Sequence, residues 1–151
     1  MRNGISETVY EIFGFESGRT MTTEIKAEMQ IDVAGNVGTY RFSGVITPGS
    51  WTDFLESFLA ADEFVTGMNS VVDLRAARIV PGGVDLARVL NTYTARKGKR
   101  GRDFRMALLV EDDFSFGVCR MLAVELEQIP VWVRVVRTED EAKAWALGKM
   151  R

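Results

Sequence analysis

The order of two hydrophobic patterns constrains the fold of this chain most. Residues 24–32, EIKAEMQID, alternate apolar and polar side chains strictly, which predicts a half-buried strand. The turn-forming residues VAGNVG follow, and TYRFSGVI at 39–46 alternates again, so the two segments form an antiparallel hairpin. From residue 47 onward, segments with helical spacing of apolar residues alternate with short apolar runs.

Helices between short apolar strands are typical of a parallel sheet with right-handed crossovers. The expected elements are, in order, a helix opening at Thr47 and Pro48, a strand at 70–74, a helix at about 84–93, a strand at 104–110, a helix at 114–128, a strand at 131–136 and a last helix with a capping box of Thr138 and Glu141. The predicted fold class is therefore α/β: a single domain with a mixed, mostly parallel sheet, an N-terminal antiparallel hairpin and helices packed on the sheet. Residues 1–20 are expected to be an N-terminal extension and 21–151 the domain; the pattern of residues 5–20 fits either an added strand or loose packing.

Composition excludes several kinds of chemistry. The chain has no histidine, so catalytic triads with an imidazole base, histidine metal ligands and a histidine pH switch are impossible. Its single cysteine, Cys119, can form neither an internal disulfide nor a thiolate zinc site, which favours a reducing cytoplasm. We expect no metal, no cofactor, no signal peptide and no membrane span. With 19 basic and 21 acidic residues the net charge is −2, so binding to nucleic acid is not expected.

Four segments resemble the SpoIIAA-like group of STAS domains, which share a fold with the CRAL-TRIO lipid-transfer domain: YRFSGVIT, VVDLRAARI, FGVCRMLA and VVRTEDEAKAWAL. The resemblance covers roughly residues 22–148 and implies a STAS-like fold and a bacterial signalling module. Some members of the wider family are switched by phosphorylation of a serine at the start of the helix after the central strand. That region reads ARIVPGGVDL here, and no Ser or Thr lies between Ser70 and Thr92, so we expect no such switch.

The acidic run at 111–113 stands where a strand is expected to end and a helix to begin. Carboxylates there can cap free amides and complement the helix dipole. We favour this interpretation over catalysis, because no histidine or metal ligand accompanies the acids. The single cysteine is interpreted as a packing residue.

The helix that follows the acidic run is apolar on two sides. One sheet needs only one apolar stripe, so the second side predicts burial against another helix or a second subunit. A close approach by that partner would explain Gly117 in the helix interior. We therefore expect a homodimer through one set of residues: Phe114, Val118, Met121 and Leu122.

Two groups of residues suggest an anionic ligand. RKGKRGRDFR at 96–105 holds six basic residues and one acid, a local charge of +5. Its arginines Arg100 and Arg102 can bind phosphate, or the segment is simply a solvated helix end. The carboxyl ends of parallel strands are the usual ligand site of such folds. At that edge we expect Arg75 and Arg78 beside the Gly82-Gly83 turn, whose amides suit an anion; Asp73 can also pair with Arg75 or Arg78 and hold the turn.

We expect, on balance, a non-enzymatic bacterial module that binds a partner protein or a small ligand, with no catalytic residues. Two alternatives stay open. One is a binder of nucleotides or anionic lipids through the basic segment. The other is a small hydrolase-like enzyme using Asp73, Asp112 or Asp113, which requires a pocket that holds at least two of them with raised pKa values.

Overall fold

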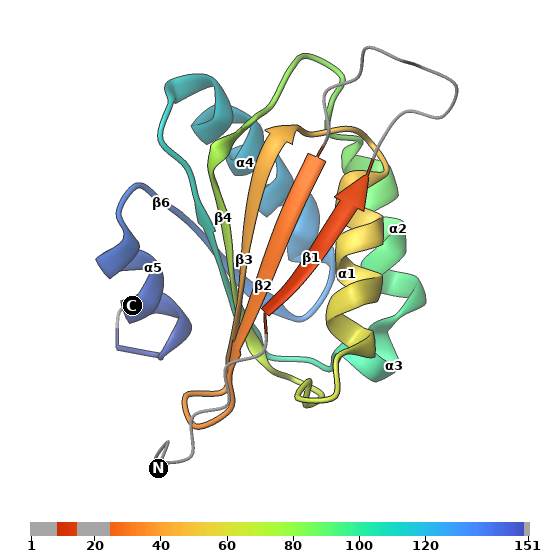
Figure 1. Ribbon diagram of the computed structural model, residues 1–151, viewed down its shortest axis with the longest axis vertical. Coiled ribbons are helices and arrows are strands. Elements are labelled where there is room, and N and C mark those ends of the chain that lie inside the picture. Colours follow the sequence, from red (N-terminus) through yellow and green to blue (C-terminus); the bar gives the residue numbers. More distant parts are fainter. Residues whose placement is uncertain (1–8, 15–24, 150–151) are drawn as a thin grey trace.

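A six-stranded sheet organises the chain (Figure 1). The structure, a computed structural model, describes residues 9–14 and 25–149. The strands are β1 (Val9–Gly14), β2 (Ile25–Asp32), β3 (Val37–Val45), β4 (Asn69–Arg78), β5 (Phe104–Leu109) and β6 (Val131–Val136). The helices are α1 (Ser50–Ala60), α2 (Leu86–Ala95), α3 (Lys97–Arg100), α4 (Asp113–Glu125), the short 3-10 turn η1 (Leu126–Gln128) and α5 (Glu139–Ala146).

Strand order in space follows strand order in sequence, from β1 to β6. The first three strands are antiparallel, and β3 to β6 are parallel. Each right-handed crossover advances one position in the same direction, so α1, α2 and α4 lie on one face of the sheet. The last helix, α5, lies on the opposite face (Figure 1). The predicted α/β class, with its hairpin and mostly parallel sheet, is confirmed.

Most of the core lies between the sheet and the three-helix layer. There the apolar faces of the hairpin meet α1: the Tyr40 ring lies 3.6 Å from that of Phe54 and 4.9 Å from that of Phe58, measured between centroids. A smaller cluster lies under α5, where Ala142, Trp145 and Ala146 cover apolar residues of β4 and β5. The indole Nε1 of Trp145 donates to the carbonyl oxygens of Met106 and Trp132, both at 3.1 Å, which fixes α5 on β5 and β6.

Two helix starts differ from the sequence prediction. Thr47 does not cap α1; the helix begins at Ser50, and the Ser50 hydroxyl instead accepts the Thr47 amide at 2.9 Å. The second helix begins at Leu86, because the Asp85 carboxylate caps it by accepting the Arg88 amide. Thr138 caps α5 as predicted, accepting the Glu141 amide at 3.2 Å. Of the ambiguous residues 5–20, those at 9–14 form β1, and the rest lie outside the described residues.

The α5 face of the sheet is only partly covered. Helix α5 contacts β4, β5 and β6, and the polar sides of β2 and β3 extend beyond it. Exposed Glu28 and Arg41 lie on this uncovered part. On this face, Arg41 of β3 therefore lies next to the first turn of α5.

Candidate functional site

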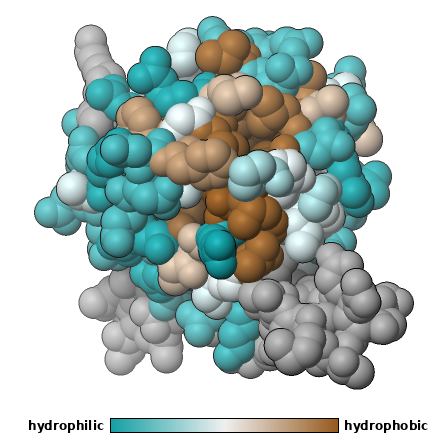
Figure 2. Space-filling model, turned by 90° about the horizontal axis from the view of Figure 1, so that it is seen from above, coloured by the Kyte–Doolittle hydropathy of each residue, from teal (hydrophilic) through white to brown (hydrophobic). Residues whose placement is uncertain are grey.

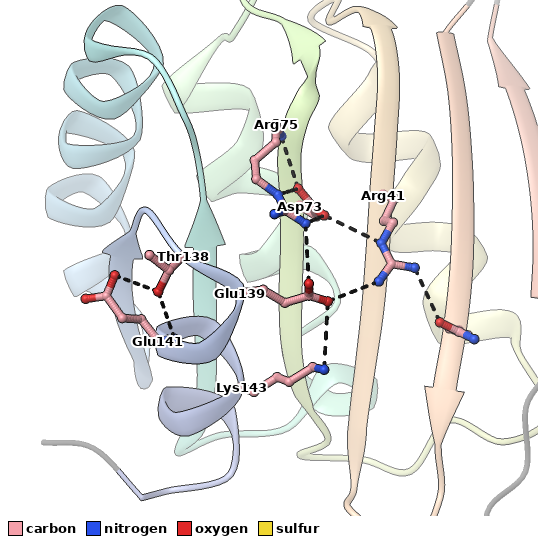
Figure 3. Close-up of polar contacts among 8 residues, drawn as sticks. Arg41, Asp73, Arg75, Thr138, Glu139, Glu141 and Lys143 are labelled. Carbon is pink, nitrogen blue, oxygen red and sulfur yellow. Dashed lines mark hydrogen bonds and ion pairs between the residues drawn. The ribbon is translucent and has the colours of Figure 1, made fainter.

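A network of charged side chains joins the middle of the sheet to the first turn of α5 (Figure 3). At its centre is Asp73 of β4, which is only 5% exposed. Its two carboxylate oxygens accept Nε and Nη2 of Arg75 at 3.0 and 2.8 Å, a bidentate pair. Arg41 of β3 adds a longer contact to Asp73, 3.5 Å from Nε to Oδ2. Glu139 of α5 lies within 4 Å of three cations: Arg41, Arg75 and Lys143.

The electrostatics of this network keep Asp73 ionised. Burial alone would raise the pKa of its carboxyl, but the hydrogen bonds and charge of Arg75, with the charge of Arg41, outweigh burial and hold that pKa below its ordinary value. The same pairing raises the pKa of Arg75. Both arginines also line a shallow hollow of about 400 Å³ that Glu111 borders. The arrangement resembles a structural clamp between sheet and helix more than an acid–base pair.

The other predicted ligand residues of this edge do not gather around that hollow. Arg78 is exposed, and its carbonyl accepts the Ile46 amide at 2.9 Å. Gly82 takes a positive φ of 77°, as a tight turn requires. The Gly83 amide forms a hydrogen bond within the turn, donating to the Val80 carbonyl at 2.8 Å. Since the Asp85 carboxylate already occupies the start of α2, the glycine turn offers an anion few free amides.

The basic segment 96–105 contains both a buried arginine and an exposed one. Arg100 is 1% exposed: its Nη1 donates to the Met68 carbonyl at 2.7 Å, and its guanidinium carbon lies 3.5 Å from the Phe104 ring centroid. Arg102, in contrast, has a side chain 77% exposed, 3.5 Å from the Asp103 carboxylate. The two arginines predicted to share an anion therefore lie in different environments. Burial of its guanidinium lowers the pKa of Arg100.

The acidic run caps α4, as the sequence predicts. The Asp112 carboxylate accepts both the amide and the hydroxyl of Ser115, each at 2.8 Å, and these hydrogen bonds lower its pKa. Asp113 accepts Arg137 Nη2 at 2.8 Å. Cys119, further along α4, is 1% exposed, and burial raises the pKa of its thiol to about 12. Among the described residues, no cluster of three or more acids and cysteines is placed to hold a metal ion.

Helix α4 carries an uncovered apolar row on its outer side. Phe114, Met121 and Val124 are 49%, 60% and 64% exposed, and we call these three residues the α4 surface. They lie on one side of the helix, with Gly117 between them at the same helical phase. Of the other residues predicted for a dimer, Val118 is half-buried against the core and Leu122 is 1% exposed. Leu122 therefore belongs to the core and is not available to a partner.

A hollow of about 530 Å³ continues the α4 surface toward the edge of the sheet. Val124 lines it from the helix, and Trp132 of β6, 60% exposed, lines it from the strand. The strand pattern VWVRVV contained the signal for Trp132, because an aromatic ring alternates with valines in a strand at the sheet edge. Arg41 and Glu139 were also missing from the predicted site, since each is an ordinary polar residue in its own pattern.

The carboxyl ends of the parallel strands form an apolar face. Figure 2 looks onto this end, the upper end in Figure 1, and shows hydrophobic side chains gathered at its centre within a polar surround. The end of β4 contributes half-buried Ala77 there, and the β4–α2 connection contributes half-buried Val80 and Val84. Such a surface suits apolar contact better than the binding of a phosphate.

Comparison with known proteins gives a likeness of fold. The chain is similar to the crystal structure of an uncharacterised protein from the DUF3478 family with a SpoIIAA-like fold, from Shewanella loihica PV-4. The alignment covers 93% of this chain and 97% of that chain, at 16% sequence identity and a TM-score of 0.48. No protein-family model matches the chain, and no curated protein matches its sequence. Within the described residues, no helix has the length and apolarity needed to cross a membrane.

Proposed function

We propose that the protein is a non-catalytic module that works by binding protein, through the α4 surface, and that its first partner is a second copy of the chain. The observation that carries this proposal is the row of three large apolar side chains on α4, each about half exposed or more. Soluble proteins seldom leave such rows uncovered, and interface cores are enriched in Phe, Met and Trp.

The shape of α4 supports a second copy as the partner. Gly117 presents a notch on the same side of the helix as the long Met121 side chain, and, apart from its chain neighbours and the backbone of α4 itself, no heavy atom lies within 4 Å of where a Gly117 Cβ would stand. A twofold axis that reverses the helix sets each Met121 against the notch of the partner. The chain thus offers both the projecting side chain and the space that receives it.

The charged groups give less support to the alternatives. An acid catalyst needs a raised pKa, whereas the pKa values of Asp73 and Asp112 are both lowered. Three members of the predicted anion site are already engaged within the chain: Arg75 binds Asp73, Arg100 is buried in the core, and the Gly83 amide donates to the Val80 carbonyl. The other members are Arg78, Gly82 and Arg102. Binding of nucleotides or anionic lipids through exposed Arg78 and Arg102 remains the second candidate, and it predicts affinity that falls with added salt.

A pair of matched substitutions tests the proposal. Met121→Glu places a charge in the α4 surface, and Val65→Glu places one on a residue that is 56% exposed and outside that surface. Size-exclusion chromatography with light scattering should show a dimer for the wild type and Val65→Glu and a folded monomer for Met121→Glu. A dimer that survives Met121→Glu, or a monomeric wild type, would contradict the proposal.

A further inference from the structure

Strand β6 is the last strand at one edge of the described sheet. It pairs with β5, and within the described residues no strand lies on its other side. The Val136 carbonyl accepts the Val110 amide, so it points toward β5. Because backbone groups of alternate residues point to opposite sides of a strand, those of Val133 and Val135 point away from the sheet. An edge of this kind is a template for another strand.

The edge and the α4 surface form one continuous region. The hollow that Val124 lines on α4 has Val131, Trp132 and Val133 of β6 as its other wall. A strand that a second copy adds to β6 would therefore lie directly beneath the helix of that copy that contacts the α4 surface. The charged residues that line this hollow are one cation, Arg120, and two acids, Asp103 and Glu127. Strand β6 itself adds a second cation, Arg134. The charges cancel, so net charge does not oppose a second copy.

We propose that β6 pairs antiparallel with β6 of a second copy across a twofold axis at Val133, which joins the two sheets into one. This inference rests on the proposed function, since it requires that the α4 surface bind a second copy. It specifies what that proposal leaves open, namely the strand that carries the interface and its register.

Side-chain chemistry selects this register. A twofold axis through the sheet keeps each face on its own side, so a residue of β6 can oppose only one that shares its face. With the axis at Val133, Trp132 stands opposite the partner's Arg134, a cation over an aromatic ring. With the axis at Arg134, two arginines oppose one another, which is unfavourable. With the axis at Trp132, Val135 stands opposite the partner's Ile129, which lies outside β6, so the ladder is one hydrogen-bonded pair shorter.

The chosen register also gives favourable side-chain pairs on both faces of the sheet. Val131 stands opposite the partner's Val135, and the valines on the α4 side form one apolar stripe beneath the two helices. On the α5 side, the Arg134 guanidinium already lies 5.6 Å from the Trp145 ring centroid. The partner's Trp132 would add a second aromatic ring beside the same cation.

Cysteine cross-linking in the full-length protein tests strand and register together. Directly opposite residues of antiparallel strands have Cα atoms about 4.5–5.5 Å apart, within disulfide range, and diagonal ones about 7–8 Å apart, beyond it. An equimolar mixture of Trp132→Cys and Arg134→Cys should form a covalent heterodimer on mild oxidation. Neither variant should cross-link efficiently by itself. Native Cys119 is buried, and wild-type protein oxidised in parallel measures its background.

The possible results separate this inference from the proposed function. Preferential cross-linking of the mixture supports the pairing. A protein that is dimeric in solution but gives no excess of the mixed cross-link overturns the β6 pairing and leaves the α4 surface as the interface. A monomeric wild type overturns both.

A proline substitution provides a second test that needs no new cysteine. The Val133 amide points outward, so Val133→Pro removes no hydrogen bond to β5 but blocks the proposed pairing. We expect a monomer with an unchanged circular dichroism spectrum. A folded Val133→Pro variant that remains dimeric would overturn the proposal.

Discussion

The guanidinium of Arg100 is stacked on the ring of Phe104 inside the core, 3.5 Å from guanidinium carbon to ring centroid. No carboxylate of the described residues lies within ion-pair distance of it, and its Nε has no hydrogen-bond partner there. The charge is held instead by aromatic rings and by the Met68 carbonyl.

This burial predicts that Arg100 stabilises the fold. Arg100→Ala should lower the free energy of unfolding by about 3 kcal/mol, because it empties core volume and leaves the Met68 carbonyl unpaired. Lys99→Ala, at the exposed neighbouring position, should change it by less than about 0.5 kcal/mol. Urea denaturation measures both. Equal effects of the two substitutions would show that Arg100 is not part of the core.

Asp73 should make stability depend on pH. Because the pKa of its carboxyl is lowered in the folded protein, its stabilisation is complete above the unfolded pKa of about 3.9 and is lost as the pH falls through the lower folded value. Asp73→Asn should cost about 1–2 kcal/mol at neutral pH, since Arg75 still reaches solvent. The difference between wild type and variant, measured by urea denaturation, should narrow in acid. A constant difference from pH 7 to pH 3 would contradict this role.

Cys119 should be inert in the folded protein. With the pKa of its thiol raised to about 12, almost no thiolate exists at neutral pH, and burial keeps reagents away. A chromogenic disulfide reagent should label it slowly under native conditions and at once in urea. Rapid native labelling would show that this part of α4 opens.

Gly117 should affect folding and association in opposite directions. Gly117→Ala should stabilise the isolated chain by about 0.5–1 kcal/mol, because alanine favours a helix interior and the added methyl group meets no neighbour within the chain. The same methyl group fills the notch proposed to receive Met121, so the dimer dissociation constant should rise. Thermal unfolding of a monomeric Met121→Glu background and sedimentation of the single variant separate the two effects. An unchanged dissociation constant would remove Gly117 from the interface.

Most of the fold could be predicted from local patterns. Strict alternation at Ala27, Met29 and Ile31 identified a strand whose apolar side is buried. Thr138 with Glu141, and Asp112 before α4, were recognised because capping depends on neighbours in sequence. These features are local, so the sequence contains the whole of the signal.

The sites were harder to predict because they depend on contacts between distant segments. Arg100 belongs to a run of basic residues that suggests solvent exposure, but it reaches Met68 and Ser70, about thirty positions away, in the core. Arg41 and Glu139 come from β3 and α5 and meet only once the sheet is assembled. For Leu122 and Met121, adjacent in one apolar helix, only the packed structure separates core from surface.

Sedimentation velocity of the wild-type protein over a wide range of concentrations tests the central claim most directly. If the α4 surface binds a second copy, the sedimentation coefficient should rise with concentration to that of a dimer, and added salt should have little effect because the contact is apolar. A sedimentation coefficient that stays at the monomer value at every concentration would contradict the account.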